Sequence, residues 1–197
     1  MLANLALLWL AALPLMGSPG PATLSTAAVG ASFGARRGLP WLAGIVAGTA
    51  VVLGLIATGV TAAVLAVPTL KTAITVVAAC YILYLAWRIA TAPPLAQDSA
   101  AARVPAFPGG FLLAVANPKA FAAIGAVYAG NSVVPGDLAA DTVVKIAALI
   151  PVIVLVNAVW LVSGTLLASS LRDPKKSRIA NVVFALLLVA SVGLALI

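Results

Sequence analysis

Lys119 is the residue of this chain whose position most strongly implies a chemical role. It lies near the middle of a stretch, Pro105 to Gly136, that otherwise carries no charge. If this stretch is a membrane helix entering at about Gly109, a rise of ~1.5 Å per residue places Lys119 ~15 Å deep in a hydrocarbon core ~30 Å thick. An ammonium at that depth costs about 3 kcal/mol, so we expect a group that solvates it or pairs with it.

Two dipeptides with the same chemistry, Ser18-Pro19 and Asn117-Pro118, lie half the chain apart. Serine and asparagine favour the N-cap position of a helix, and proline favours its first turn. Each pair therefore predicts the end of one half-helix and the start of another inside the bilayer. Backbone amides at such N-termini favour anionic groups, and the candidates are those of Ala22, Thr23 and Ala120.

The composition indicates which class of protein contains these motifs. The 197 residues are 64% hydrophobic and 8% charged, and the mean hydropathy is +1.22. A soluble core of this length could not bury so much apolar surface, so we predict a polytopic membrane protein. The net charge of +7 is spread between apolar runs without interleaved aromatics, which argues against nucleic-acid binding. Cys80 is the one cysteine, which excludes an intrachain disulfide.

Six apolar segments, separated by turn-forming residues such as Gly38-Leu39-Pro40, predict an all-α fold. Their approximate bounds are 2–34, 41–66, 69–90, 109–130, 143–169 and 178–197. The first is too long for one straight crossing, so its interruption at residues 17–21 predicts two half-helices or one kinked crossing.

The predicted architecture is one transporter domain, 1–197, with six transmembrane helices in two inverted three-helix repeats. Helices 1 and 4 are the broken ones. Repeat one covers 1–95, a cytoplasmic linker covers 92–108, and repeat two covers 105–197.

Basic residues in the loops orient this arrangement, because lysine and arginine accumulate on the cytoplasmic side. Counted from the N-terminus, the second and fourth loops between the six segments hold only Lys71 and Lys145. The first, third and fifth loops hold the other eight basic loop residues, namely Arg36, Arg37, Arg88, Arg103, Arg172, Lys175, Lys176 and Arg178. We therefore predict that both termini face outward.

Small residues at helical spacing predict close packing between helices. They form one face with Thr23, Thr26, Gly30 and Gly34, and Gly44 and Gly48 repeat the pattern. Of these, Thr23 and Thr26 are also candidate ligand contacts because they lie near the first break. Asn157, Trp160 and Gly164 share a face of the fifth segment, where an asparagine can bond a neighbouring helix or a substrate. Such small faces also allow a homodimer.

Four blocks of this chain together resemble the LysE/RhtB family of amino-acid exporters. Ser18-Pro19-Gly20-Pro21, followed by a small-residue helix and Arg36-Arg37-Gly38, resembles the family signature. The blocks 81–88, ending in Trp87-Arg88, and 110–120, which contains Asn117-Pro118-Lys119-Ala120, are similar to the family's third and fourth helices. Gly44 and Gly48 fit its second helix.

The resemblance implies export of amino acids or close derivatives from the cytoplasm, driven by the proton gradient across a bacterial inner membrane. It implies no enzyme activity, cofactor or metal. Its substrate-binding candidates are Ser18, Pro19, Gly20, Pro21, Thr23, Asn117, Pro118, Lys119 and Asn157. Members usually carry phenylalanines where this chain has Ala122 and Ala123, so we expect a wider cavity here.

The expected mechanism places the substrate carboxylate on Lys119 and the half-helix amides. Carbonyls freed near Gly17 and Ala114 accept its amino group, and one repeat rocks against the other. The chain has no His or Glu, and Asp137 and Asp141 are expected in an outer loop. Lys119 is then the titratable group at depth, and we predict that it exchanges a proton for the substrate's negative charge.

Three alternatives to transport of amino acids follow from the same residues. An intramembrane hydrolase would use Ser18 as nucleophile and Lys119 as base. A divalent-cation exporter would need acidic or sulfur ligands within the spans. Cys80 is the one candidate ligand of this kind in a predicted span. A membrane scaffold without transport would not need Lys119.

Overall fold

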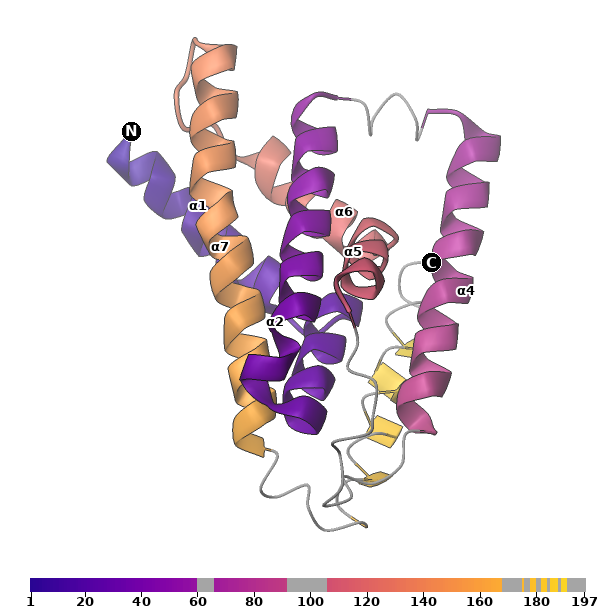
Figure 1. Ribbon diagram of the computed structural model, residues 1–197. Helices are drawn as coiled ribbons and strands as arrows, with labels where there is room; N and C mark the ends of the chain where they lie inside the picture. The colour runs from indigo at the N-terminus through magenta and orange to yellow at the C-terminus, as the bar shows by residue number, and fades with distance from the viewer. Residues whose placement is uncertain are drawn as a thin grey trace.

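A computed structural model describes residues 1–59, 66–91 and 106–167, together with single residues between 175 and 190. Within these residues the regular structure is helical and contains no strand, which confirms the predicted all-α class. Figure 1 shows the arrangement of the helices. Most of the predicted linker 92–108 and of the sixth apolar segment, 178–197, lies outside the described residues.

The first predicted break separates α1, Leu2–Gly17, from α2, Pro21–Ala57. Ser18 follows α1 in an extended conformation (φ −65°, ψ 153°), and Gly20 before α2 is also extended. Pro21 begins α2, at a position where the missing N–H of proline has no helical acceptor to lose. The interruption thus joins two helices.

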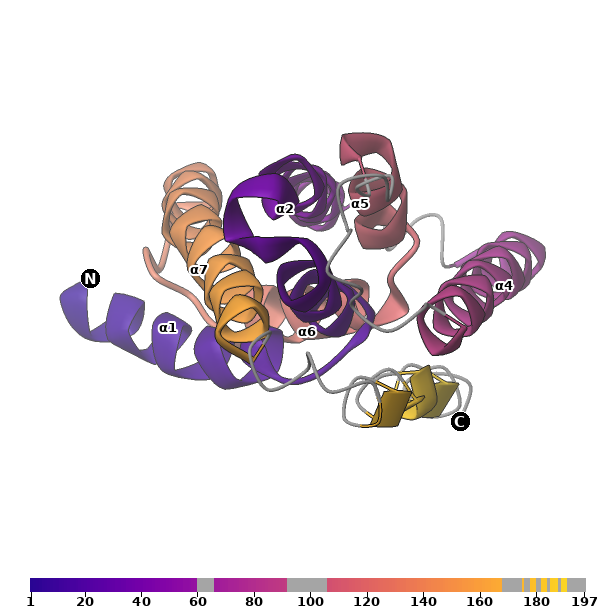
Figure 2. The same cartoon turned by 60° about the horizontal axis from the view of Figure 1, so that its bottom comes forward.

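α2 reverses direction at Gly34, whose φ of 77° and ψ of 161° lie in a region that suits glycine. A Cβ added at Gly38 would lie 3.2 Å from the side chain of Val29, whereas nine residues of straight helix span ~13.5 Å. α2 therefore has a short arm, 21–33, and a long arm, 35–57, which lie side by side (Figure 2). We expected this boundary at Gly38-Leu39-Pro40, which was wrong because the helix continues through Pro40.

The second predicted break is present between α5, Phe107–Val115, and α6, Pro118–Gly130. The two helices are bent by 59° relative to each other and together have the length and composition of one span. α4 covers Pro68–Ala90 and α7 covers Leu138–Leu167. α7 begins before the predicted 143, so it includes residues that we had expected in a loop.

Backbones approach closely at the predicted small-residue faces, except at Gly34, where the helix is interrupted and an added Cβ would meet no atom within 4 Å. α2 packs most extensively against α7 and α5. A Cβ at Gly30 would collide with the carbonyl of Leu161 in α7, and one at Gly164 would collide with the carbonyl of Ala27 in the short arm. Gly44 in the long arm likewise leaves no room beside the backbone of α5. Glycine at these points lets the helices approach to backbone contact.

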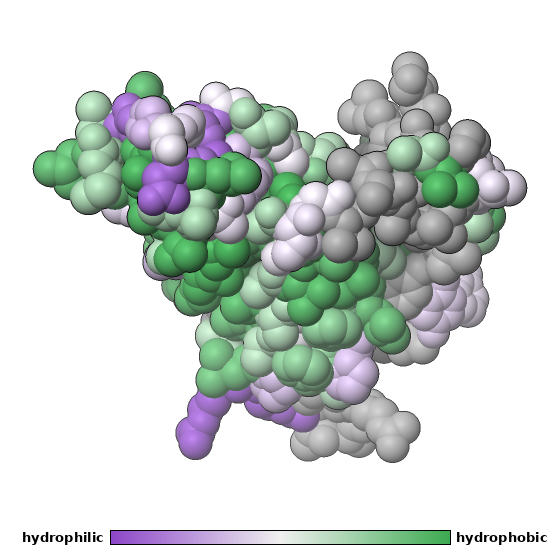
Figure 3. Space-filling model, turned by 90° about the horizontal axis from the view of Figure 1, so that it is seen from above, coloured by the Kyte–Doolittle hydropathy of each residue, from purple (hydrophilic) through white to green (hydrophobic). Residues whose placement is uncertain are grey.

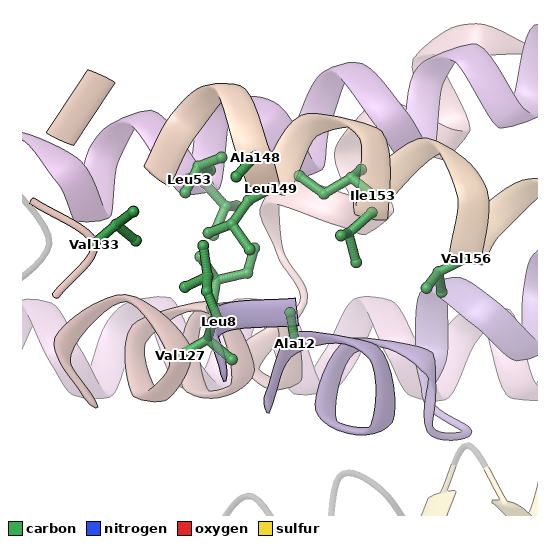
Figure 4. Packing of buried hydrophobic residues seen from close by; sticks show 12 residues of the cluster. Leu8, Ala12, Leu53, Val127, Val133, Ala148, Leu149, Ile153 and Val156 are labelled. Carbon is green, nitrogen blue, oxygen red and sulfur yellow. The ribbon is translucent and has the colours of Figure 1, made fainter. Parts of the chain in front are cut away.

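A buried apolar cluster joins α1, α6 and α7 (Figure 4). Leu8 of α1, Leu53 of the long arm and Leu149 of α7 are fully buried in it. With Val127 of α6 they hold α1 against the long arm, α6 and α7, and this packing sets the relative position of the two breaks.

Large apolar side chains cover much of the described part of the face drawn in Figure 3, where they are green. Leu2, Leu10 and Leu166 are 81%, 69% and 73% exposed. Apolar exposure on this scale suits contact with lipid. α2 and α7 are each long and apolar enough to cross a membrane, and the bent α5–α6 pair would make a third span. The chain is a membrane protein, and the described helices account for part of the predicted spans.

Candidate functional site

The two breaks meet in space through Lys119, at the start of α6. Its Nζ donates hydrogen bonds to the carbonyl oxygen of Ser18 and, at 3.1 Å, to that of Pro19. Both acceptors lie in the extended link between α1 and α2, about half the chain away in sequence. The half-buried ammonium is thus solvated by backbone carbonyls of the link between the helices.

The first break is held by Thr23, while Ser18 does not have the role that we predicted. The Thr23 hydroxyl accepts a 2.9 Å hydrogen bond from the N–H of Gly20 and lies 3.1 Å from the Gly20 carbonyl. Ser18 was expected to cap α2, but its hydroxyl donates back to the carbonyl of Leu15 at 2.9 Å. Ser18 ends α1 and Gly20 precedes α2, so the predicted serine cap was wrong.

The second break matches the prediction more closely. Asn117 is the N-cap of α6, and its Oδ1 accepts a hydrogen bond of 3.2 Å from the backbone N–H of Lys119. Pro118 occupies the first position of that helix. The N-cap bond and the proline fix the first turn of α6, and with it the root of the Lys119 side chain.

A pocket lies where the breaks meet, between α1, both arms of α2, α6 and α7. It encloses about 430 Å³ of empty space, including its open mouth. Its lining residues are Leu15, Met16, Gly20, Ala22, Thr23, Thr49, Asn117, Lys119, Ala120, Ala123, Ile124, Ile153, Val156 and Asn157. Among the described residues of this lining Lys119 is the charged one, and none of them is acidic.

The pocket brings together five of the nine predicted site residues: Gly20, Thr23, Asn117, Lys119 and Asn157. The other four are Ser18, Pro19, Pro21 and Pro118, which shape the breaks and are not part of the lining. Pro19 is exposed, and Ser18 and Pro19 contribute their carbonyls to Lys119.

Asn157 of α7 is a buried polar residue of the lining, 6% exposed. Its Nδ2 donates to the carbonyl of Ile153 at 2.9 Å. Its Oδ1 is buried without a hydrogen-bond partner among the residues that the structure describes. A buried acceptor without a donor is unfavourable, so this oxygen suits a ligand that brings a donor.

Three backbone groups that we expected to be open to a substrate already have partners. The carbonyl of Gly17 accepts a 3.0 Å hydrogen bond from the indole of Trp160. The carbonyl of Ala114 accepts from the N–H of Asn117 at 3.3 Å, and the N–H of Ala120 donates to the carbonyl of Asn117 at 3.0 Å. The structure instead directs the carbonyls of Ser18 and Pro19 to the site.

Thr49 and Met16 line the pocket but were not among the predicted site residues, and Ala122 does not have its predicted place in the lining. Thr49 reaches the pocket from the long arm, and its hydroxyl donates to the carbonyl of Ile45 at 2.7 Å. The sequence feature that could have indicated Thr49 is its position directly after Gly48, a residue of a predicted small-residue face. Ala123 lines the pocket as expected, but Ala122 is exposed and does not.

Asp141 and Lys145 form a second polar site, away from the pocket lining. We expected both in an outer loop, but they lie in the first turns of α7, buried and joined by a 2.7 Å ion pair. Asp141 also accepts from the N–H groups of Val133 and Val134. Lys145 also donates to the carbonyl of Tyr128 at 2.9 Å. This cluster fastens the end of α6 and the following loop to α7.

The arrangement around Ser18 does not form the pair that hydrolysis would require. Lys119 bonds the Ser18 carbonyl, while the Ser18 hydroxyl faces the carbonyl of Leu15. A serine nucleophile needs its hydroxyl bonded to the base. Among the described residues there is also no group of three or more His, Cys, Asp or Glu side chains placed to hold a metal ion.

Comparison with known proteins identifies one family. The sequence model of the LysE type translocators matches residues 13–197, which confirms the resemblance indicated by the proline motifs. No curated protein and no solved structure matches the chain.

Proposed function

We propose that this chain, which belongs to the LysE type translocator family, exports amino acids or close derivatives from the cytoplasm by a proton-driven mechanism. Family membership makes it a membrane transport protein. The observation that carries the finer proposal is Lys119, the one charged side chain among the described residues of a pocket formed where two broken helices meet.

The chemistry of Lys119 supports binding of a carboxylate. Its present partners are two neutral carbonyls, those of Ser18 and Pro19. A carboxylate bonds an ammonium more strongly than a neutral carbonyl does, because both partners are then charged. A substrate can therefore replace these carbonyls on Lys119. The N-termini of α6 and of the short arm of α2 both lie at the pocket and favour the same negative charge.

Movement is proposed to follow from this exchange. The Lys119 bonds link residues of the two predicted repeats, so a substrate that takes over Lys119 releases one repeat from the other. The repeats then rock about the pocket and open it to the opposite side. We retain the predicted six-span inverted repeat, the outward-facing termini, the bacterial inner membrane and a homodimer as parts of this proposal.

Export from cells tests the role of Lys119. Cells are loaded with a panel of dipeptides, and the free amino acids that leave are measured for the intact chain and for Lys119→Met. We expect export to fall about tenfold or more, because a charge-assisted hydrogen bond is worth ~1.5–3 kcal/mol. Lys175→Met is the matched control, since it removes an exposed lysine. Equal export by Lys119→Met and the intact chain would contradict the proposal.

Proton coupling is tested separately with Lys119→Arg in membrane vesicles under an imposed pH gradient. Arginine keeps the charge but does not release its proton. We expect substrate binding to remain and pH-driven export to be lost. Full coupling in this variant would remove Lys119 as the proton carrier while leaving its carboxylate role intact.

A further inference from the structure

We infer that the pocket selects amino acids with an uncharged aliphatic side chain, with the α-carboxylate on Lys119 and the α-ammonium on Oδ1 of Asn157. The inference rests on the proposed function and assigns a substrate class to that site. It depends on the orientation of one amide, on the charges of the lining, and on the nature of the pocket wall.

The orientation of the Asn157 amide follows from its one hydrogen bond. The group that faces the carbonyl of Ile153 at 2.9 Å must be the NH₂, because two oxygens would repel each other there. The oxygen is therefore the buried atom without a donor among the described residues. An ammonium supplies up to three N–H donors, so it satisfies Oδ1 where a carboxylate or an apolar group cannot.

The charges of the lining exclude a second charge on the substrate. One carboxylate can be neutralised by Lys119, and the described residues of the lining include no acidic side chain for the cationic end of a lysine or arginine substrate. A second carboxylate, as in glutamate, would compete for the same ammonium and leave one anion against apolar groups. Both cases leave an unpaired charge away from water, which is unfavourable.

Apart from Asn117, whose Oδ1 accepts from the N–H of Lys119, the remaining wall is apolar or already satisfied. The side chains of Leu15, Met16, Ile124, Ile153 and Val156 form most of it. The two threonines of the lining have backbone partners, because Thr49 donates to Ile45 and Thr23 to the carbonyls of its own break. No hydroxyl there is directed to a polar substrate side chain. The wall therefore suits leucine, isoleucine, valine or methionine better than serine, lysine or glutamate.

The test uses the purified full-length chain in liposomes and measures efflux of leucine, serine, lysine and glutamate. We expect leucine to be carried with a kcat/KM about tenfold or more above that of lysine and glutamate, because each of these leaves a charge unpaired. Lysine or glutamate carried as well as leucine would overturn the inference but leave amino-acid export standing. Failure to carry any amino acid would instead overturn the proposed function.

Asn157→Leu tests the ammonium contact, with 4-methylpentanoate as a leucine analogue that lacks the ammonium. The intact chain should prefer leucine to this acid about tenfold or more, since the acid leaves Oδ1 unsatisfied. The variant should lose most of that preference through a raised KM for leucine. An unchanged preference in a folded variant would overturn the assignment.

Two further variants keep this test decisive. Asn131→Leu is the matched control, because Asn131 also donates from Nδ2 to the carbonyl four residues before it, yet does not line the pocket. It should retain the full preference for leucine. Asn157→Asp keeps an oxygen acceptor if Asn157→Leu fails to fold. Asn157→Asp should still prefer leucine to 4-methylpentanoate, and it should also carry lysine. Loss of the leucine preference in this variant would contradict the role of Oδ1.

Discussion

Gly20 is the residue that lets Lys119 reach the first break. Its extended backbone could be adopted by any residue, so conformation alone does not require glycine there. A Cβ at this position, however, would run into the Lys119 side chain and lie 3.0 Å from Nζ. The absence of a side chain at one break therefore complements the long side chain of the other.

We predict that Gly20→Ala lowers export about tenfold while changing stability little, because the added Cβ displaces Lys119 from the place where it would bind the substrate carboxylate and costs that charge-assisted bond. Export kinetics in liposomes and thermal unfolding in detergent measure the two effects. Gly125→Ala in α6 is the control, since a Cβ there meets no atom within 4 Å. Normal export by Gly20→Ala would show that the position of Lys119 tolerates displacement.

At the scale of the elements, the reversal of α2 decides which residues share the pocket. The short arm contributes Ala22 and Thr23, and the long arm contributes Thr49. In one straight helix Thr23 and Thr49 would lie ~39 Å apart. The turn at Gly34 brings them to the same cavity.

We predict that Gly34→Ala destabilises the protein by about 1–3 kcal/mol, because the backbone region near φ 77° and ψ 161° is accessible essentially only to glycine. Denaturation followed by circular dichroism in detergent measures the loss. Gly54→Ala, in the long arm of the same helix with no atom within 4 Å of the added Cβ, should be neutral or slightly stabilising. Equal stability of the two variants would rule out strain at Gly34.

At the scale of the molecule, the buried ion pair of Asp141 and Lys145 anchors α7 to the end of α6 at a distance from the pocket. Side chains of both residues are less than a tenth exposed. The ammonium also lies 4.5 Å from the centre of the Tyr128 ring. These contacts make the pair a structural clamp, and the pocket needs neither residue in its lining.

We predict that Lys145→Met destabilises the protein by about 3–5 kcal/mol, because it leaves the Asp141 carboxylate buried and unpaired. The double variant Asp141→Asn with Lys145→Met removes both charges but keeps an acceptor for Val133 and Val134. It should regain most of the loss, as measured by denaturation in detergent. The KM for leucine should stay unchanged in both, and a raised KM would indicate that the clamp acts on the pocket.

The sequence by itself determined the all-α membrane class, both proline breaks, the N-cap at Asn117 and the close-packed glycine faces. These features depend on backbone sterics and on hydrogen bonds within about one helical turn, so residue type and spacing suffice to predict them. The depth of Lys119 in the bilayer stays a prediction, because it assumed a straight helix from Gly109 whereas α5 and α6 are bent by 59°.

Only the tertiary structure decided which groups meet. Lys119 could have bonded any exposed acceptor, and its pairing with Ser18 and Pro19 depends on how the apolar cluster of α1, α6 and α7 packs. Packing likewise selected Gly34 over Gly38 as the turn and buried Asp141 beside Lys145. It also left Oδ1 of Asn157 without a donor from the part of the chain that the structure describes. Contacts between residues far apart in the chain are selected by the fit of whole helices, which local sequence rules do not encode.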